Sequence, residues 1–314
     1  MRQNDPPMRW YYLLVGAFAL VSLPLAGDAW PFVLSHWIPL VLVLPVVGAL
    51  AIVRERIRGD RGRAWLTEYR DAAVRCRPLA RLRHAAPALV LYPVVIGCYV
   101  GWRLWLNRHV PFTWDARLAG IEGQRASEWL VRAFAEWPPL YRAVEVAYGS
   151  LWLVFTLGMM TYVAFQPASR ERTRYFVTLA LVFPLAGNVA SGLLMSAGPV
   201  YYRHVVCGPD VYAPTVALLD RVSTWMRPGQ LALWSLHSRH SGFPSTGVTA
   251  APSMHVVVAT LAACWWWAQG RRAIALGAVT FTVLGSVVTG WHYWLDGVIA
   301  IVLTIAIWLS ARLR

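Results

Sequence analysis

Two histidines near the C-terminal end of the chain have neighbours that suit chemistry on a phosphate group. His292 lies four residues before Asp296, and His255 follows Pro252 and Ser253. Residues four apart share one face of a helix, so the Asp296 carboxylate could hold one ring nitrogen of His292 and leave the other free as a nucleophile. His255 could then protonate a leaving oxygen as a general acid.

Ser253 is expected to cap the helix that carries His255. The first turn of such a helix presents free backbone N–H groups and the positive end of the helix dipole, which together bind phosphate. Taken singly, a histidine at a membrane interface is usually a satisfied polar residue, and a serine before a helix is usually an ordinary cap. Two such histidines, each opening an apolar stretch, favour the catalytic interpretation.

The composition describes a membrane protein. Of 314 residues, 58% are hydrophobic and only 14% are charged, too few to cover the surface of a soluble domain. The fold class expected is therefore an all-α polytopic membrane bundle. All basic residues are arginines scattered among apolar segments, which argues against a nucleic acid partner. The cysteines Cys76, Cys98, Cys207 and Cys264 are too dispersed for a disulfide framework or a metal cluster.

A helix needs roughly 20 apolar residues to cross a bilayer, and this length predicts about eight spans. The first apolar run contains Pro24 and is followed at once by another, so it is interpreted as a retained span and not a signal peptide. Residues 1–86 would hold two spans and an arginine-rich loop, and residues 87–314 a six-span core. The predicted spans are 10–27, 33–53, 87–106, 144–166, 174–195, 253–269, 272–290 and 292–311.

Arginine positions predict the orientation. Cytoplasmic loops are enriched in basic residues, and an inside N-terminus places the arginines of the 54–86 loop and of the short links in the cytoplasm. The loops 107–143 and 196–252 then lie outside, and both histidines enter their spans from outside. The retained first span and the exclusive use of arginine favour a bacterial inner membrane, with the site on its periplasmic or extracellular face.

The sequence leaves two interpretations open for each of the segments 54–86 and 107–143. The 54–86 loop also contains acidic residues, so it is either a solvated surface helix or a docking surface for anionic lipid head groups. Within 107–143, apolar residues recur at helical spacing, which suits either a helix lying in the outer interface or simple packing over the bundle. These residues are Trp129, Leu130, Ala133, Phe134 and Trp137.

The two histidine motifs resemble those of a known family. Pro252-Ser253-Met254-His255 and Gly290-Trp291-His292-Tyr293-x-x-Asp296 are similar to the last two signature motifs of the type 2 phosphatidic acid phosphatase superfamily. The similarity extends over roughly 110–311 and is greatest to the branch that contains fungal inositol phosphorylceramide synthase and its bacterial relatives. Three further stretches resemble that branch: Gly247-Val248-Thr249-Ala250-Ala251, Ala197-Gly198-Pro199-Val200-Tyr201-Tyr202, and Trp114-Asp115-x-x-Leu118-Ala119-Gly120 before Tyr148-Gly149-Ser150-Leu151-Trp152.

The resemblance implies a fold and a mechanism. It implies a six-helix core with the site at its outer end, a phospho-histidine formed on His292, orientation of that ring by Asp296, and assistance to the leaving alcohol by His255. It implies no cofactor and no metal. His237 and His240 have a spacing that a metal would accept, but no carboxylate or cysteine lies near them in the sequence.

The chain departs from the wider superfamily at the phosphate clamp. It contains no lysine, so the Lys-x6-Arg-Pro motif is absent, and Ser286 stands where many members have an arginine six residues before the nucleophile. A transferring phosphoryl group needs positive charge or oriented donors. We therefore predict substrate binding by Arg203 and Arg239, with Tyr201, Tyr202 and Ser253, although each arginine could equally be a solvated loop charge.

The function predicted is transfer of a phosphorylated head group, such as inositol phosphate, from a phospholipid donor to a lipid alcohol. The alternative is a lipid phosphate phosphatase, in which water replaces the acceptor. Apolar surroundings rich in tryptophan (Trp225, Trp234, Trp291, Trp294) favour the lipid acceptor, although tryptophan is also common at membrane interfaces. A non-catalytic transporter or scaffold is less favoured because ionisable residues cluster at span ends. The oligomeric state stays open.

Overall fold

The computed structural model describes residues 8–25, 78–239 and 248–311. Every regular element in these ranges is a helix. Three helical segments are long and apolar enough to cross a membrane: Arg83–His109, Pro138–Ala164 and Arg170–Leu193. Four shorter apolar helical segments accompany them: Arg9–Leu25, Met254–Ala268, Arg272–Val288 and Trp294–Ser310. The chain is thus an all-helical protein of membrane type.

The predicted count of eight spans is not settled by these ranges. The predicted span 33–53 and most of the arginine-rich loop 54–86 lie outside the described residues. The third predicted span, 87–106, is longer than expected: it is part of α4 (Pro78–His109), which continues through Pro87 and Pro93. The other predicted positions each carry a helix, with boundaries shifted by a few residues.

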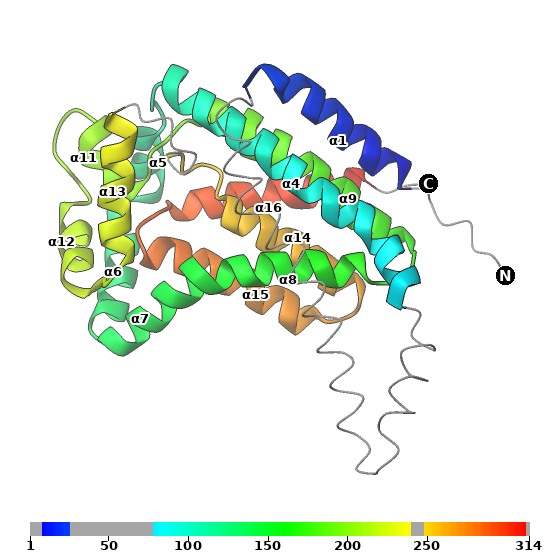
Figure 1. The fold of residues 1–314 in the computed structure, drawn as a ribbon. Helices are drawn as coiled ribbons and strands as arrows, with labels where there is room; N and C mark the ends of the chain where they lie inside the picture. The colour runs from blue at the N-terminus through cyan, green and yellow to red at the C-terminus, as the bar shows by residue number, and fades with distance from the viewer. Residues whose placement is uncertain (1–7, 26–77, 240–247, 312–314) are drawn as a thin grey trace, which may run out of the picture.

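The long helices lie side by side as a bundle (Figure 1). Two of them contain a π-helical stretch. One runs through α7 (Pro138–Val146), η2 (Ala147–Leu151) and α8 (Trp152–Ala164), and the other through α9 (Arg170–Val182), η3 (Phe183–Ala190) and α10 (Ser191–Leu193). The last three helices are α14 (Met254–Ala268), α15 (Arg272–Val288) and α16 (Trp294–Ser310).

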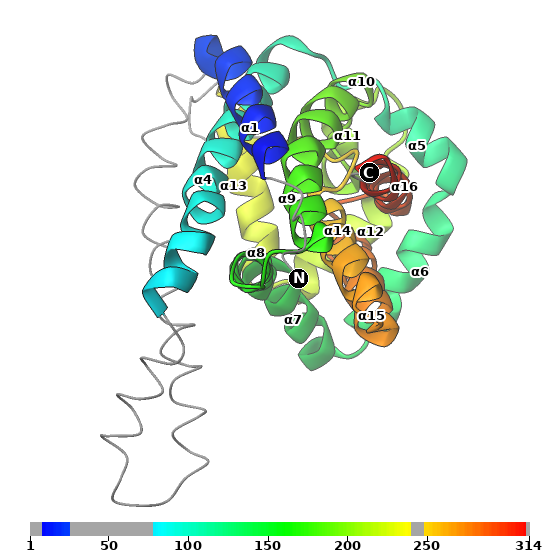
Figure 2. The same cartoon turned by 90° about the vertical axis from the view of Figure 1, so that its right-hand side faces the viewer.

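Helix α14 occupies the centre of the bundle, seen end-on with α15 and α16 in Figure 2. It packs against both α15 and α16, and almost every residue from Met254 to Ala263 is buried. A helix that is apolar on all sides can be buried on all sides, and its small residues allow close helix approach. His255 therefore projects from the first turn of a helix that is enclosed by its neighbours.

Helix α1 (Arg9–Ser22) packs on the outside of this core against α4 and α9. The Tyr11 hydroxyl donates to the Ala88 carbonyl at 3.3 Å, and the Tyr11 ring lies 5.4 Å from that of Phe176. The Trp102 ring nitrogen donates to Ser22 Oγ at 3.0 Å. Because α1 contacts the far side of α4, it supports the core without reaching the histidines.

The segments predicted as external loops fold into short helices gathered at one end of the bundle (Figure 1). We call this group the outer cap; it consists of α5 (Asp115–Glu122), α6 (Gln124–Ala135), η4 (Pro199–Tyr201), α11 (Tyr202–Val205), α12 (Ala213–Val222) and α13 (Met226–Ser238).

The apolar stripe predicted along 107–143 is divided in the structure. Leu130 and Phe134 pack against a buried cluster around Val131, whereas Trp129 and Trp137 are 69% and 62% exposed. Within α6, Trp129 and Ala133 are exposed while Leu130 and Phe134 face the cluster, and Trp137 lies beyond the end of α6 at Ala135.

Candidate active site

His292 and Asp296 are brought together at the start of α16. His292 Nδ1 lies 3.3 Å from Asp296 Oδ2, and the same oxygen accepts the backbone N–H of Tyr293 at 3.0 Å. Asp296 is fully buried and His292 is 8% exposed. The predicted helix over 292–311 begins later, at Trp294, so the pair is formed across the first turn and not along a helix face.

The turn that presents His292 depends on a glycine. Gly290 has a φ of +74°, which L side chains rarely adopt, and a Cβ there would meet Val200 and Leu219. After this turn the His292 backbone N–H donates to the Ser286 carbonyl at 3.3 Å. The backbone of His292 is thus held by Ser286, and its imidazole ring is held by Asp296.

His255 lies beside His292, with ring centroids 6.3 Å apart. Its imidazole is held between two aromatic rings, at 4.6 Å from Tyr148 and 4.0 Å from Trp152. Tyr148 belongs to the π-helical stretch η2. Single π turns occur often at functional sites, and here the wider turn places Tyr148 against the histidine.

Ser253 occupies the N-cap position of α14 as predicted, but its side chain makes no capping hydrogen bond. Its backbone N–H donates instead to the Asp296 carbonyl at 3.3 Å, and its side chain is fully buried near Tyr148. Ser253 therefore connects the two histidine motifs through the backbone. Its hydroxyl is turned to the interior, which is why it does not cap the helix.

Asp115 holds three segments together around the site. Its carboxylate accepts the N–H groups of Ala197 and Gly198 at 2.9–3.0 Å and the Tyr293 hydroxyl at 2.8 Å. Gly198 has a φ of +101°, and a Cβ there would collide with the Trp291 carbonyl. The resemblance motif contained Asp115, but nothing in its spacing indicated that it supports the residue after His292.

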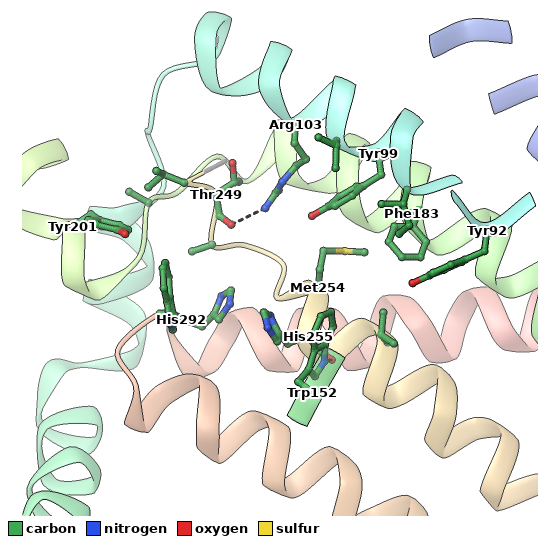
Figure 3. Close-up of a pocket in the computed structure, with 17 residues that line it drawn as sticks. Tyr92, Tyr99, Arg103, Trp152, Phe183, Tyr201, Thr249, Met254, His255 and His292 are labelled. Atoms are coloured by element: carbon green, nitrogen blue, oxygen red, sulfur yellow. Dashed lines mark hydrogen bonds between the residues drawn. The ribbon is translucent and has the colours of Figure 1, made fainter. Parts of the chain in front are cut away.

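A cavity of about 330 Å³ opens onto both histidines (Figure 3). Its lining reaches along α4 from Arg103 to Tyr92, three helical turns or about 16 Å at 1.5 Å per residue. Most of the lining is aromatic or aliphatic: Tyr92, Ile96, Tyr99, Val100, Trp152, Phe183, Ala197, Tyr201, Val248, Ala250, Met254, Val258 and Trp291, with Thr249 at the polar end. Such a cavity suits an apolar chain with a polar group beside the histidines.

Arg103 also lines the cavity, and the sequence prediction missed it. Its side chain is buried, at 9% exposure. An arginine inside the predicted span 87–106 was a detectable signal, because ionisable residues within spans are rare and mark functional sites. Its position near one end of that span made it look like an ordinary flanking charge.

The predicted substrate-binding residues lie in different places. Tyr201 lines the cavity, stacks on Trp234 at 5.1 Å and donates its hydroxyl to the Gln230 carbonyl at 2.9 Å. Tyr202 is buried against Tyr212 and is not part of the lining. Arg203 and Arg239 are exposed on the outer cap, also away from the lining.

His237 and His240 have a spacing that is compatible with metal binding, but the sequence predicted no metal there. His237 lies 5.5 Å from the Phe112 ring and 5.3 Å from Trp234, and His240 lies outside the described residues. Within the described ranges, no group of three or more histidine, cysteine or acidic residues could hold a metal ion.

Comparison with known proteins gives the family. The model of the PAP2 superfamily, the type 2 phosphatidic acid phosphatases, matches residues 119–310, which include both histidine motifs and Asp296. No curated protein and no solved structure matches the chain. The inositol phosphorylceramide synthase branch stays a prediction. The chain belongs to the PAP2 superfamily, and this membership suggests phosphatase or phosphotransferase activity on lipid-like substrates.

Proposed function

We propose that the protein is an integral membrane lipid phosphotransferase that works through a phospho-histidine on His292. The observation that carries this proposal is the shared cavity: the His292–Asp296 pair and His255 meet at one end of an apolar space. A phospholipid could place its phosphate at the histidines and its hydrocarbon along the apolar wall.

In the first step His292 Nε2 attacks phosphorus. With Nδ1–H donated to Asp296 Oδ2, Nε2 holds the lone pair that forms the new P–N bond. The P–O bond to the lipid breaks, its electron pair stays on the leaving oxygen, and His255 supplies the proton that makes it an alcohol. Asp296 stabilises the positive ring that results, because it is fully buried and adjacent.

In the second step a lipid alcohol attacks the phospho-histidine. His255 takes the hydroxyl proton, the new P–O bond forms, and the P–N electrons return to Nε2. The apolar lining of the cavity favours a lipid acceptor over water, since few polar side chains there would retain water. Water in the same position would make the protein a lipid phosphate phosphatase, the second candidate.

Residues of the outer cap would recognise the parts of the substrate that leave the cavity. Tyr201 lines the cavity on the cap side, where a head group such as inositol would lie. Arg203, Arg239 and Tyr202 are proposed for the same region, and Ser253 for the phosphate end. With the N-terminus in the cytoplasm, the outer cap faces the periplasm or the exterior of a bacterial inner membrane.

The test is turnover of head-group-labelled phosphatidylinositol by purified protein in detergent, with and without ceramide. We expect an acceptor-dependent phosphoinositol lipid from the wild type and a loss on the order of 10⁴-fold in His292→Ala. His109→Ala is the matched control, because His109 is exposed at the end of α4. Labelled phosphoinositol formed without ceramide would favour the phosphatase, and equal turnover in His292→Ala would refute the nucleophile.

A further inference from the structure

Arg103 is a buried cation without a counter-ion. No carboxylate pairs with it in the described part of the chain, where the ion pairs are Arg132–Glu128, Arg227–Asp220 and His292–Asp296. A buried charge is expensive unless it is paired or used, and the expense is greatest within an apolar bundle. The residue therefore needs either strong structural support or an anionic ligand.

Arg103 is hydrogen-bonded by the protein, but all of its partners are uncharged groups. Arg103 Nη1 donates to Ser191 Oγ at 2.8 Å and to the Gly187 carbonyl at 3.5 Å, and Nη2 donates to the Thr249 carbonyl at 2.8 Å. These bonds employ three of the five guanidinium N–H donors and fix the plane of the group. They leave two donors and the whole positive charge for another partner.

The guanidinium of Arg103 lies across the cavity from the two histidines. Figure 3 shows Arg103 reaching from α4 to the loop at Thr249, with His255 and His292 on the opposite side of the cavity. Asn107 secures that loop, since its Oδ1 accepts the Val248 N–H at 3.0 Å and its Nδ2 donates to Thr249 Oγ1 at 3.1 Å. Arginine and loop are thus one rigid wall of the cavity.

The residue at the usual clamp position does not provide charge. Ser286 is fully buried beneath the His292 turn, and its hydroxyl donates to the Val283 carbonyl of its own helix at 2.7 Å. Among the cavity-lining residues of the described chain, Arg103 is the one arginine. It also lies before the matched family segment, which begins at residue 119.

We propose that Arg103 is the anion-binding residue of this site and holds the phosphate oxygens of an amphiphilic substrate opposite the histidine pair. The proposal rests on the proposed function for its choice of substrate. A guanidinium presents parallel donors to two oxygens at once, which suits a phosphate whose third side must stay open to a nucleophile. The apolar wall from Val100 to Tyr92 would receive the hydrocarbon below it.

The test measures anion binding without turnover. Purified protein in detergent is titrated with ³²P-labelled inorganic phosphate, and hexyl phosphate is then added as competitor. Arg103→Gln removes the charge but keeps a polar side chain, and Arg103→Lys keeps the charge without the fork. Arg108→Gln is the matched control, because Arg108 is exposed on the same helix.

We expect wild type, Arg108→Gln and His292→Ala to bind phosphate, and hexyl phosphate to displace it. Arg103→Gln should bind roughly 10- to 100-fold more weakly, and Arg103→Lys should fall between. Gel filtration and the unfolding temperature without phosphate verify that the variants fold.

Three results would overturn the proposal. They are phosphate binding by folded Arg103→Gln equal to wild type, no binding by wild type, and failure of hexyl phosphate to compete. Arg103-dependent binding in a protein that turns over no lipid would support the anion site while refuting the proposed function, so the two failures are distinguishable.

Discussion

The charged residues around the site differ from three arginines at the opposite end of the bundle. At the outer end Asp115 and Asp296 are at most 1% exposed and Arg103 is 9% exposed. Asp115 and Arg103 are bound by groups from other segments of the chain, the Tyr293 hydroxyl and the Thr249 carbonyl among them. Asp296 is bound by its near neighbours His292 and Tyr293. The charged groups at this end are buried, and hydrogen bonds fix the position of each one.

At the end away from the outer cap, which we call the inner end, three arginines lie over tryptophan rings, whereas Arg172 is buried and donates to the Ala164 and His84 carbonyls. Arg174 is 4.2 Å from the centre of Trp308, Arg271 is 5.2 Å from Trp266, and Arg272 is 5.3 Å from Trp267. Arg271 and Arg272 are exposed, so they keep their charge near water and their stems against apolar surface, as expected of anchors at a membrane interface. Arg174 is half-buried and also donates to the Trp308 carbonyl.

The difference shows which charges are available for chemistry. An anchoring arginine needs only proximity to water and an apolar surface, so its exact position matters little. A charge buried in the bundle is retained only where other groups define its position, and that precision is what a reacting phosphate requires. Substitutions at the two ends should therefore have very different consequences.

After the loss of the nucleophile itself, the largest effect is expected from Asp296→Asn. The amide preserves the size of the side chain but cannot fix the His292 tautomer or stabilise its positive ring, so lipid turnover should fall on the order of 10³-fold. The assay is head-group transfer at saturating donor, and Asp220→Asn is the control because Asp220 is 52% exposed. A fall of less than about fivefold in a folded variant would show that Asp296 does not act through His292.

The next effect should appear in stability. Asp115→Ala leaves two buried backbone N–H groups and the Tyr293 hydroxyl without their acceptor, so we expect the free energy of unfolding to fall by about 2–4 kcal/mol. Denaturant unfolding in detergent measures it, with Asp220→Ala for comparison. Unfolding curves that coincide with wild type would mean that Asp115 does not hold the outer cap to the site.

A smaller, pH-dependent effect should come from Glu122 in the outer cap. Burial raises its pKa to about 7, because desolvation outweighs the hydrogen bonds from Tyr212 and Ser127. Its Oε2 is buried without a partner among the described residues, as a protonated carboxyl would tolerate.

The folded protein thus binds this proton more tightly than the unfolded chain does. Its stabilising effect is complete below about pH 4.5 and is lost as the pH rises through about 7. Between pH 5 and pH 8 the unfolding temperature of wild type should fall further than that of Glu122→Gln. Parallel curves for the two proteins would remove Glu122 as the cause.

The smallest effect is expected at the inner end. Arg174→Gln removes the cation over Trp308 and the 2.7 Å hydrogen bond to the Trp308 carbonyl, so the unfolding free energy should change by about 1 kcal/mol. Lipid turnover should stay within about twofold of wild type. A loss of turnover as large as that of Asp296→Asn would erase the distinction between the two ends.

Local spacing explains what the sequence could predict. Runs of apolar residues indicate where helices cross, and His292 and Asp296 are only four residues apart, so their contact could be predicted although the helix begins after His292. Arg203 was chosen because it follows the tyrosine pair, and Arg239 because it lies between His237 and His240. Position along the chain does not place a side chain in a cavity, so their part in substrate binding stays a proposal. Both arginines are exposed on the outer cap.

The remaining features depend on contacts between distant segments. Arg103 is fixed by Gly187, Ser191 and Thr249, and Asp115 by Ala197 and Gly198, none of them close in sequence. No periodicity within one helix encodes such contacts. The π-helical stretches η2 and η3 were not predicted either, although Pro184 at the start of η3 was a local signal of an irregular helix.

The most direct test of the account is to look for phosphate on His292. Protein mixed with head-group-labelled phospholipid, without acceptor, is quenched in alkali and digested, and the peptide carrying His292 is examined by mass spectrometry. The account predicts a head-group phosphate that is stable to alkali, lost in acid, absent from His292→Ala, and discharged when the acceptor lipid is added. Turnover without any adduct, even in rapid-quench samples, or an adduct on another residue would contradict it.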